Sequence, residues 1–513
     1  MNPAAGWVAV ALVGVVTLAI GAFGLRISRT TSDFYVASRS VQPLWNASAI
    51  GGEYLSAASF LGVAGLVLAF GADMLWFPVG FATGYLVLLV LVAAPLRRSG
   101  AYTIPDFAEA RLESPAVRRL ASALVGVVGW LYLLPQLQGA GLTLRTVTGA
   151  PAWAGAVLVA AVVVLNVVAG GMRSITFVQA FQYWLKLTAL LVPLVVLLVV
   201  WRGDGAPSPA AAAGGADGGW LLPLSGDDPH DLYRTYSLML ATFLGTMGLP
   251  HVLVRFYTNP DGRAARRTTV IVLGLLAVFY LLPPVYGALG RVYAPDLVAS
   301  GRTDAVVLEL PGRMVDGLGG DLLGALLTAG AFAAFLSTSS GLAVSVSGAL
   351  SQDVLTRIPL RGGRRLGGVA AFRVSALLAL TVPLTIALST QGLAVASSVG
   401  LAFAVAAATF CPLLVLGIWW HRLTDVGALA GLLAGGLASG LAVVLVIADP
   451  DRPGWGGALL AQPAAWAVPV GFAVMVAGSL LTPRRVAPGV TRTMVRLHAP
   501  ESLELNRDSW QPR

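Results

Sequence analysis

Two polar segments lie inside long apolar runs and carry the residues best suited to binding chemistry. The first, residues 46–59, contains the pair Gly51-Gly52 followed directly by Glu53. The second, residues 331–341, contains consecutive hydroxyl residues at 337–340. Each glycine weakens a helix by about 1 kcal/mol relative to alanine, so the first segment is a candidate helix break. Broken helices that offer bare carbonyls and dipole ends are typical of ion and substrate sites in secondary transporters.

Helical spacing puts three positions of the second segment on one face. Ala334, Ser337 and Thr338 stand at i, i+3 and i+4, and residues so spaced are neighbours on a helix surface. A carbonyl freed at Ala334 and two hydroxyls offer neutral oxygens, which suit a hard cation. In the alternative interpretation the hydroxyls bond back to the preceding turn and the glycines form a packing notch. We expect a monovalent cation site between the two segments.

Other polar side chains lie at similar depth in the apolar runs. A charge at Glu53 near mid-span costs about 2.5–3.5 kcal/mol on insertion scales, so its side chain should face the bundle interior. Lys186 also lies within a predicted span, and the sequence names no partner for it. Gln136 and Gln138 either line the same cavity or form hydrogen bonds between helices.

The composition excludes a soluble protein. Hydrophobic residues make up 57% of the 513 residues and charged residues 11%, against about 25% charged in soluble domains. The basic residues behind the net charge of +9 stand in short clusters between apolar runs, so no nucleic-acid partner is expected. No phosphate-binding loop is present, so no ATP hydrolysis is expected. The single cysteine and the scattered histidines show no metal-ligand spacing, and we predict no enzyme activity.

The apolar runs predict about thirteen membrane-spanning helices, each needing about 20 residues. With the N-terminus outside, most of the 33 Lys and Arg residues fall on the cytoplasmic side, which predicts an N-out, C-in topology in the plasma membrane. The predicted spans are 5–25, 44–70, 74–96, 119–144, 151–171, 179–201, 233–256, 268–290, 318–350, 370–390, 393–420, 425–447 and 463–482.

At both polar segments the chain resembles the sodium/solute symporter family, specifically its acetate/monocarboxylate permease (cation acetate symporter) branch. The resemblance runs from residues 33–39 to the last span. It is most specific at residues 52–62 (GEYLSAASFLG), 248–258 (GLPHVLVRFYT) and 331–341 (AFAAFLSTSSG). The chain departs from the family by carrying Gln179 where sugar and proline members have an acid, and Glu53 where acetate-type sequences have Asp.

The resemblance implies an all-α, LeuT-like core of two inverted five-helix repeats in a chain of thirteen helices. The expected divisions are a leading helix and cytoplasmic loop (1–42), repeat 1 (43–201), an extracellular loop (202–232), repeat 2 (233–447), a final loop and helix (448–482) and a cytoplasmic tail (483–513).

The resemblance also implies a sodium site and a substrate site. The sodium ligands are the carbonyls of Gly52 and Leu55 together with Ala334, Ser337 and Thr338, the last three being the residues that the helical-face argument selects. The substrate residues are Glu53, Tyr54, Ser56, Thr242, Gly245 and Thr246.

The implied function is sodium-coupled symport of a small monocarboxylate such as acetate into the cell. No arginine is expected at the depth of the substrate, because the positive-inside rule explains Arg255. Hydroxyls, helix dipoles and the bound cation would hold the carboxylate. Two alternatives stay open: a proton-coupled permease with Glu53 as the proton carrier, and a solute sensor or channel of the same fold.

Overall fold

The computed structural model describes residues 2–27, 37, 40–212, 218–222, 224, 229–356, 366–390, 395–449, 452–499 and 503. The motif at 33–39, apart from residue 37, and the far end of the predicted tail lie outside these residues. Within the described part of the chain the regular structure is helical, and its one isolated β-bridge joins Thr424 to Val486. The predicted all-α class is therefore confirmed.

Eleven helical segments of the described chain are long and apolar enough to cross a membrane. Two of them contain a break where the sequence predicts a boundary between spans. The helix Ala152–Gly203 contains Gly171 at φ 55°, and the segment Ala58–Leu91 contains Gly71 at φ 75°. Large apolar side chains such as Leu281 remain exposed on the outer surface. A multi-pass membrane protein is confirmed, whereas the count of thirteen and the orientation remain predictions.

The helices of the first half of the chain are α1 (Pro3–Ile27), α3 (Pro43–Tyr54), α4 (Val63–Phe70), α5 (Trp76–Leu91), α6 (Ala93–Arg98), α7 (Ile104–Leu112), α8 (Pro115–Thr148), α9 (Ala152–Gly203), α10 (Pro209–Ala212), α11 (Asp231–Gly248) and α12 (Pro250–Val254). The second half has α13 (Gly262–Tyr280), α14 (Leu282–Tyr293), α15 (Asp296–Ala299), α16 (Val306–Met314), α17 (Gly317–Leu350), α18 (Gly368–Ser389), α19 (Val395–Trp419), α20 (Asp425–Ala448), α21 (Gly454–Ala461), α22 (Ala464–Leu481) and α23 (Val490–His498). Two π-helical turns, Ala58–Gly62 and Ser351–Leu355, precede α4 and follow α17.

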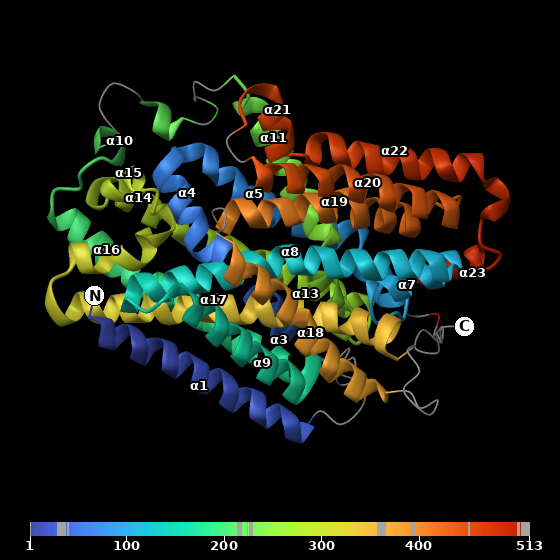
Figure 1. Ribbon diagram of the computed structural model, residues 1–513, viewed down its shortest axis with the longest axis horizontal. Coiled ribbons are helices and arrows are strands. Elements are labelled where there is room, and N and C mark those ends of the chain that lie inside the picture. The colour runs from blue at the N-terminus through green and yellow to red at the C-terminus, as the bar shows by residue number, and fades with distance from the viewer. Residues whose placement is uncertain are drawn as a thin grey trace.

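The long helices run side by side along the longest axis of the molecule (Figure 1). In this bundle α9 packs against α17, α3 and α1, while α11 packs between α5 and α19. The pair α20 and α22 contacts α19 from outside. The start of α1 lies toward one end of the bundle, and α7 and α23 lie toward the other (Figure 1). The helices α3, α9 and α17, which are far apart in sequence, contact one another inside this bundle.

Two helices are interrupted near the middle of the bundle. The first break follows α3, where Leu55 has φ −73° and ψ 80° before the chain enters the π-helical turn at Ala58. The second follows α11, where Leu249 is extended at ψ 118° and Pro250 opens α12. The residue before a proline is disfavoured in the helical region, which accounts for the second break. The sequence missed this one, although Gly248-Leu249-Pro250 is its local signal.

The first break lies three residues beyond the glycine pair rather than at it. Gly51 and Gly52 are both inside α3, so the expectation of a break at these glycines is corrected. Their role is close packing: a Cβ on Gly52 would lie 2.1 Å from the backbone oxygen of Gln179, and one on Gly51 would lie 2.8 Å from the Tyr183 ring. The pair lets the backbones of α3 and α9 touch, which brings α9 side chains to the open end of α3.

Candidate cation and substrate site

The end of α3 leaves carbonyl groups that its own helix no longer satisfies, as every helix end does. Within the chain segment itself, the Leu55 N–H donates to Gly51 O at 3.1 Å and the Ser56 N–H donates to Tyr54 O at 2.8 Å. The carbonyls of Gly52, Glu53 and Leu55 instead accept from side chains of other helices. The break is therefore held open by tertiary contacts.

A single cationic group gathers oxygens from both sides of the break. The Lys186 Nζ of α9 donates to Gly52 O at 2.5 Å, to Leu55 O at 2.6 Å and to Ser337 Oγ at 3.1 Å. A lysine ammonium has three N–H donors and no acceptor, so these three oxygens match its full capacity. The side chain is completely buried. Lys186, for which the sequence named no partner, thus sits among residues predicted to bind sodium.

The remaining predicted sodium residues lie in the same place. Thr338 Oγ1 donates to Glu53 O at 2.6 Å, and Ser337 Oγ donates to Ala334 O at 3.1 Å. The helix α17 is continuous through these positions, so Ala334 does not carry the freed carbonyl that the sequence suggested. Gly52, Leu55, Ser337 and Thr338 meet around the break, whereas Ala334 O contacts Ser337 Oγ within α17. Three of them, Gly52, Leu55 and Ser337, accept from the Lys186 ammonium. Their role as sodium ligands remains a proposal.

Glu53 forms a buried ion pair with Arg255. Its Oε2 lies 2.6 Å from Arg255 Nε, and both side chains are at most 2% exposed. Arg255 also donates to Thr176 Oγ1 at 2.8 Å and to Gln179 Oε1. The charge of Glu53 is engaged with Arg255, and its placement in the substrate site remains a prediction. The expectation that no arginine lies at this depth is corrected, since Arg255 is fully buried beside Glu53.

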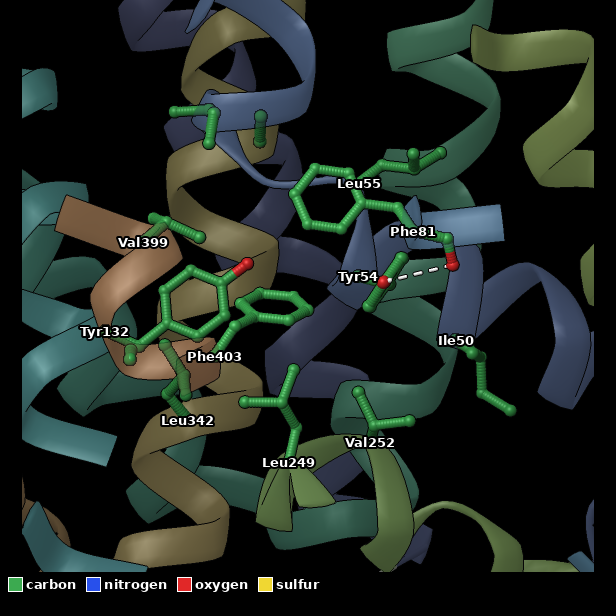
Figure 2. Close-up of a cluster of buried hydrophobic side chains, with 14 of the residues drawn as sticks. Ile50, Tyr54, Leu55, Phe81, Tyr132, Leu249, Val252, Leu342, Val399 and Phe403 are labelled. Carbon is green, nitrogen blue, oxygen red and sulfur yellow. Dashed lines mark hydrogen bonds between the residues drawn. The ribbon is translucent and has the colours of Figure 1, made fainter. Parts of the chain in front are cut away.

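On the other side of the break, Tyr54 joins the two interrupted helices. Its hydroxyl lies 2.7 Å from Thr246 Oγ1 of α11 and donates to Phe81 O at 3.3 Å. The Tyr54 ring meets Tyr85, Phe81 and Phe403 edge-on at centroid distances of 4.7, 5.9 and 6.2 Å. Figure 2 shows the Tyr132 ring beside Phe403, across from Tyr54. Aromatic rings and hydroxyl groups therefore surround this point.

Other predicted substrate residues occupy different settings. The Ala58 N–H donates to Ser56 Oγ at 3.2 Å, so Ser56 belongs to the break. Thr242 Oγ1 bonds to Leu238 O of its own helix at 2.9 Å. A Cβ on Gly245 would lie 2.5 Å from the Phe403 carbonyl. Thr242 and Gly245 thus serve the packing of α11, whereas Tyr54, Ser56 and Thr246 carry hydroxyls at the break.

The two glutamines of α8 differ in role. The Ala57 N–H donates to Gln136 Oε1 at 3.4 Å, so this buried side chain lies at the start of the resumed helix. Gln138 Nε2 donates to Thr390 O at 3.2 Å and ties α8 to the end of α18.

The sequence also passed over His251 of α12, a buried ring that meets Tyr132 edge-on at 5.3 Å. The described residues contain no group of three or more His, Cys, Asp or Glu side chains suited to holding a metal.

Comparison with known proteins agrees with this architecture. The chain resembles the "Uncharacterized symporter YwcA" of Bacillus subtilis (strain 168), with 32% identity over 99% of the chain and 100% of the relative. A Na⁺-coupled sialic acid symporter, solved in a substrate-bound outward-open state, superposes with a TM-score of 0.67 at 15% identity, covering 94% of this chain and 98% of that one. Mhp1, a nucleobase-cation-symport-1 family transporter with bromovinylhydantoin bound, gives 0.57 at 15% identity over 91% and 99%. These two structures establish the transporter fold.

The family itself follows from the sequence match. The profile described as "Sodium:solute symporter family" matches residues 34–435, which is most of the chain. At the level of this family, a transporter rather than an enzyme is confirmed, as is the use of sodium. The acetate/monocarboxylate branch remains a prediction. The chain belongs to the sodium:solute symporter family.

Proposed function

We propose that the protein is a sodium-coupled symporter that carries a small, acetate-like monocarboxylate into the cell. One observation carries the coupling part of this proposal: Gly52 O, Leu55 O and Ser337 Oγ converge within hydrogen-bond distance of one cationic nitrogen. A point that attracts an ammonium through neutral oxygens also suits a sodium ion, because both are monovalent cations that need oxygen partners. These oxygens belong to α3, to the break and to α17. The affinity for a cation bound among them therefore depends on how these segments are positioned relative to one another.

We assign the substrate carboxylate to the aromatic side of the break. Tyr54 and Thr246 supply hydroxyls, and the resumed helix begins beside Ser56, where the Ala57 N–H donates to Gln136 Oε1 and the Ala58 N–H donates to Ser56 Oγ. Helix N-termini carry partial positive charge and favour anions. Arg255 is paired with Glu53 and Lys186 with backbone oxygens, so neither is placed to bind a carboxylate. Hydroxyl groups beside the start of a helix suit a small anion.

The tight helix contacts around this point favour a small substrate over a sugar. A Cβ on Gly84 of α5 would lie 2.6 Å from Thr246, and Tyr54 is only 2% exposed. Four aromatic rings close the remaining sides, as Figure 2 shows for Phe81, Tyr132 and Phe403. A substrate of a few heavy atoms is the size that small side-chain movements accommodate here.

Coupling follows from the shared break. A cation bound at Gly52 and Leu55 fixes the end of α3, and Tyr54, which lies between these residues, presents its hydroxyl to the substrate. Each ligand then shifts the equilibrium between outward-open and inward-open states by its differential affinity for the two. Sodium moving down its gradient thereby drives the anion uphill.

Purified protein in liposomes tests this directly. At clamped membrane potential, an inward sodium gradient should drive accumulation of labelled acetate, and replacement of sodium by N-methylglucamine should abolish it. Uptake that follows a pH gradient and ignores sodium identifies the proton-coupled alternative, and equilibration without accumulation identifies the channel. A counterflow panel of acetate, propionate, pyruvate and glycolate then ranks the substrates.

A further inference from the structure

The only lysine of this chain stands at the candidate cation site. Of the 33 basic residues, Lys186 is the single lysine and all the others are arginine. The two side chains are not interchangeable, because an ammonium is a compact point charge with three rotatable donors whereas a guanidinium is a wide planar fork. The group at position 186 meets three oxygens that converge on one point. This geometry suits an ammonium and does not match the planar donor arrangement of a guanidinium.

We propose that the Lys186 side chain is a tethered cation that competes with sodium for these oxygens, so that sodium binds only after the side chain has left. This inference rests on the proposed function, since it concerns the same site. The two cations exclude one another for two reasons: Gly52 O, Leu55 O and Ser337 Oγ are already the partners of Nζ, and two positive charges at this separation repel strongly in a buried environment.

In the sodium-free carrier, the Lys186 ammonium supplies the positive charge that the three converging oxygens would otherwise receive from sodium. Lys186 projects from α9, whereas its oxygen partners belong to α3, the break and α17. Its three hydrogen bonds therefore fasten the open end of α3 to two other helices. In its absence these buried carbonyls would lack partners, which is costly in a water-free interior. Lys186 thus maintains the break until sodium takes over the same contacts.

The structure also offers the displaced ammonium a destination. Glu53 Oε1 is buried and has no hydrogen-bond partner, while its Oε2 is paired with Arg255. A movement of the lysine side chain to Oε1 would release the three oxygens and exchange neutral partners for a carboxylate. Sodium entry would then be linked to a new contact at Glu53, one residue before Tyr54.

Removal of the competitor should tighten sodium binding. Equilibrium binding of labelled sodium to the purified wild type and to Lys186→Met gives the comparison, with Gln182→Met as the matched control. Gln182 lies one turn earlier on α9, is buried and bonds to Thr17. If Lys186 holds the site in most molecules, Lys186→Met should lower the sodium dissociation constant at least about tenfold, because apparent affinity scales with the competent fraction. Gln182→Met should leave it unchanged.

A second measurement needs no variant. Because Lys186 is the sole lysine, labelling with [ζ-¹⁵N]lysine gives one side-chain amine signal, which should shift on sodium addition with the same midpoint as sodium binding. Unchanged or weaker sodium affinity in Lys186→Met overturns the competition, as does a stationary amine signal while sodium binds, or an absence of sodium binding in both proteins. If only Lys186→Met binds sodium, the competition is supported while sodium coupling of the wild type fails.

Discussion

Substitution of Ser337 removes one oxygen from the candidate cation site and leaves the others in place. Its hydroxyl is one of three oxygens at the convergence point, and one such contact is worth about 1–1.5 kcal/mol. Ser337→Ala should therefore raise the sodium concentration for half-maximal acetate uptake about tenfold. Sodium titrations of uptake in liposomes measure this. Ser339→Ala is the control, since Ser339 lies on the same helix with a buried hydroxyl that has no partner; an equal effect of both variants would remove Ser337 from the site.

Substitutions in the Glu53–Arg255 pair test whether Glu53 is a structural charge or a proton carrier. Removing one member of a buried pair leaves the other unpaired and costs about 3–5 kcal/mol. Glu53→Gln should therefore lower the yield of monodisperse protein and its unfolding temperature, and adding Arg255→Met should recover part of both. Thermal unfolding in detergent measures this. A Glu53→Gln protein that is fully stable yet loses pH-dependent uptake would instead assign Glu53 to proton transfer.

At the residue level, the local pattern contained only part of the information about the candidate site. The face of Ala334, Ser337 and Thr338 follows from helical spacing alone, and the structure brings Ser337 and Thr338 of this face to the break. The partners of Lys186 did not follow, because backbone carbonyls leave no mark in the sequence. The Glu53–Arg255 pair spans 202 positions, a separation at which a charge pattern carries no information about contact.

At the scale of the helix, a glycine in the sequence can mark either a helix break or a close contact between two helices. Gly171 marks a real break with φ 55°, and the sequence placed a span boundary there. Gly51 and Gly52 look alike in sequence but stay helical because α9 packs directly on them. The actual break at Leu55 has no local breaker, since its carbonyls are satisfied from α9 and α17. Tertiary contacts, which a single sequence does not show, decided its position.

Gly52→Ala tests whether this close approach matters. The new methyl carbon would lie 2.1 Å from the backbone oxygen of Gln179, and backbone atoms yield little, so α3 and α9 must separate. Overpacking of this kind costs about 1–3 kcal/mol, and the separation moves Gly52 O away from Lys186. We expect sodium-driven uptake to fall more than about tenfold. Gly14→Ala on α1, where nothing lies within 4 Å, is the control; retained uptake in Gly52→Ala would contradict the packing role.

At the scale of the whole molecule, Arg118 connects three elements at the end of the bundle that carries α7. Arg118 of α8 lies 2.8 Å from Asp106 and 2.5 Å from Glu109, both on α7, and also pairs with Asp353 in the turn after α17. The side chains of Arg118, Asp106 and Asp353 are at most 4% exposed. The predicted topology makes this the cytoplasmic end. The cluster therefore ties α17, which carries Ser337, to a loop helix at that surface.

Asp106 gives this cluster a pH dependence with a defined sign. Burial raises the pKa of Asp106 from 3.8 to about 6, although Arg118 acts in the opposite direction. The folded protein therefore takes up a proton between pH 7 and 5 that the unfolded chain does not, so folding stability increases as pH falls through this window. The wild type should gain about 1 kcal/mol over Asp106→Asn between pH 7 and 5. Thermal unfolding of both proteins in detergent across that range measures the difference, and parallel pH profiles would show that Asp106 does not titrate there.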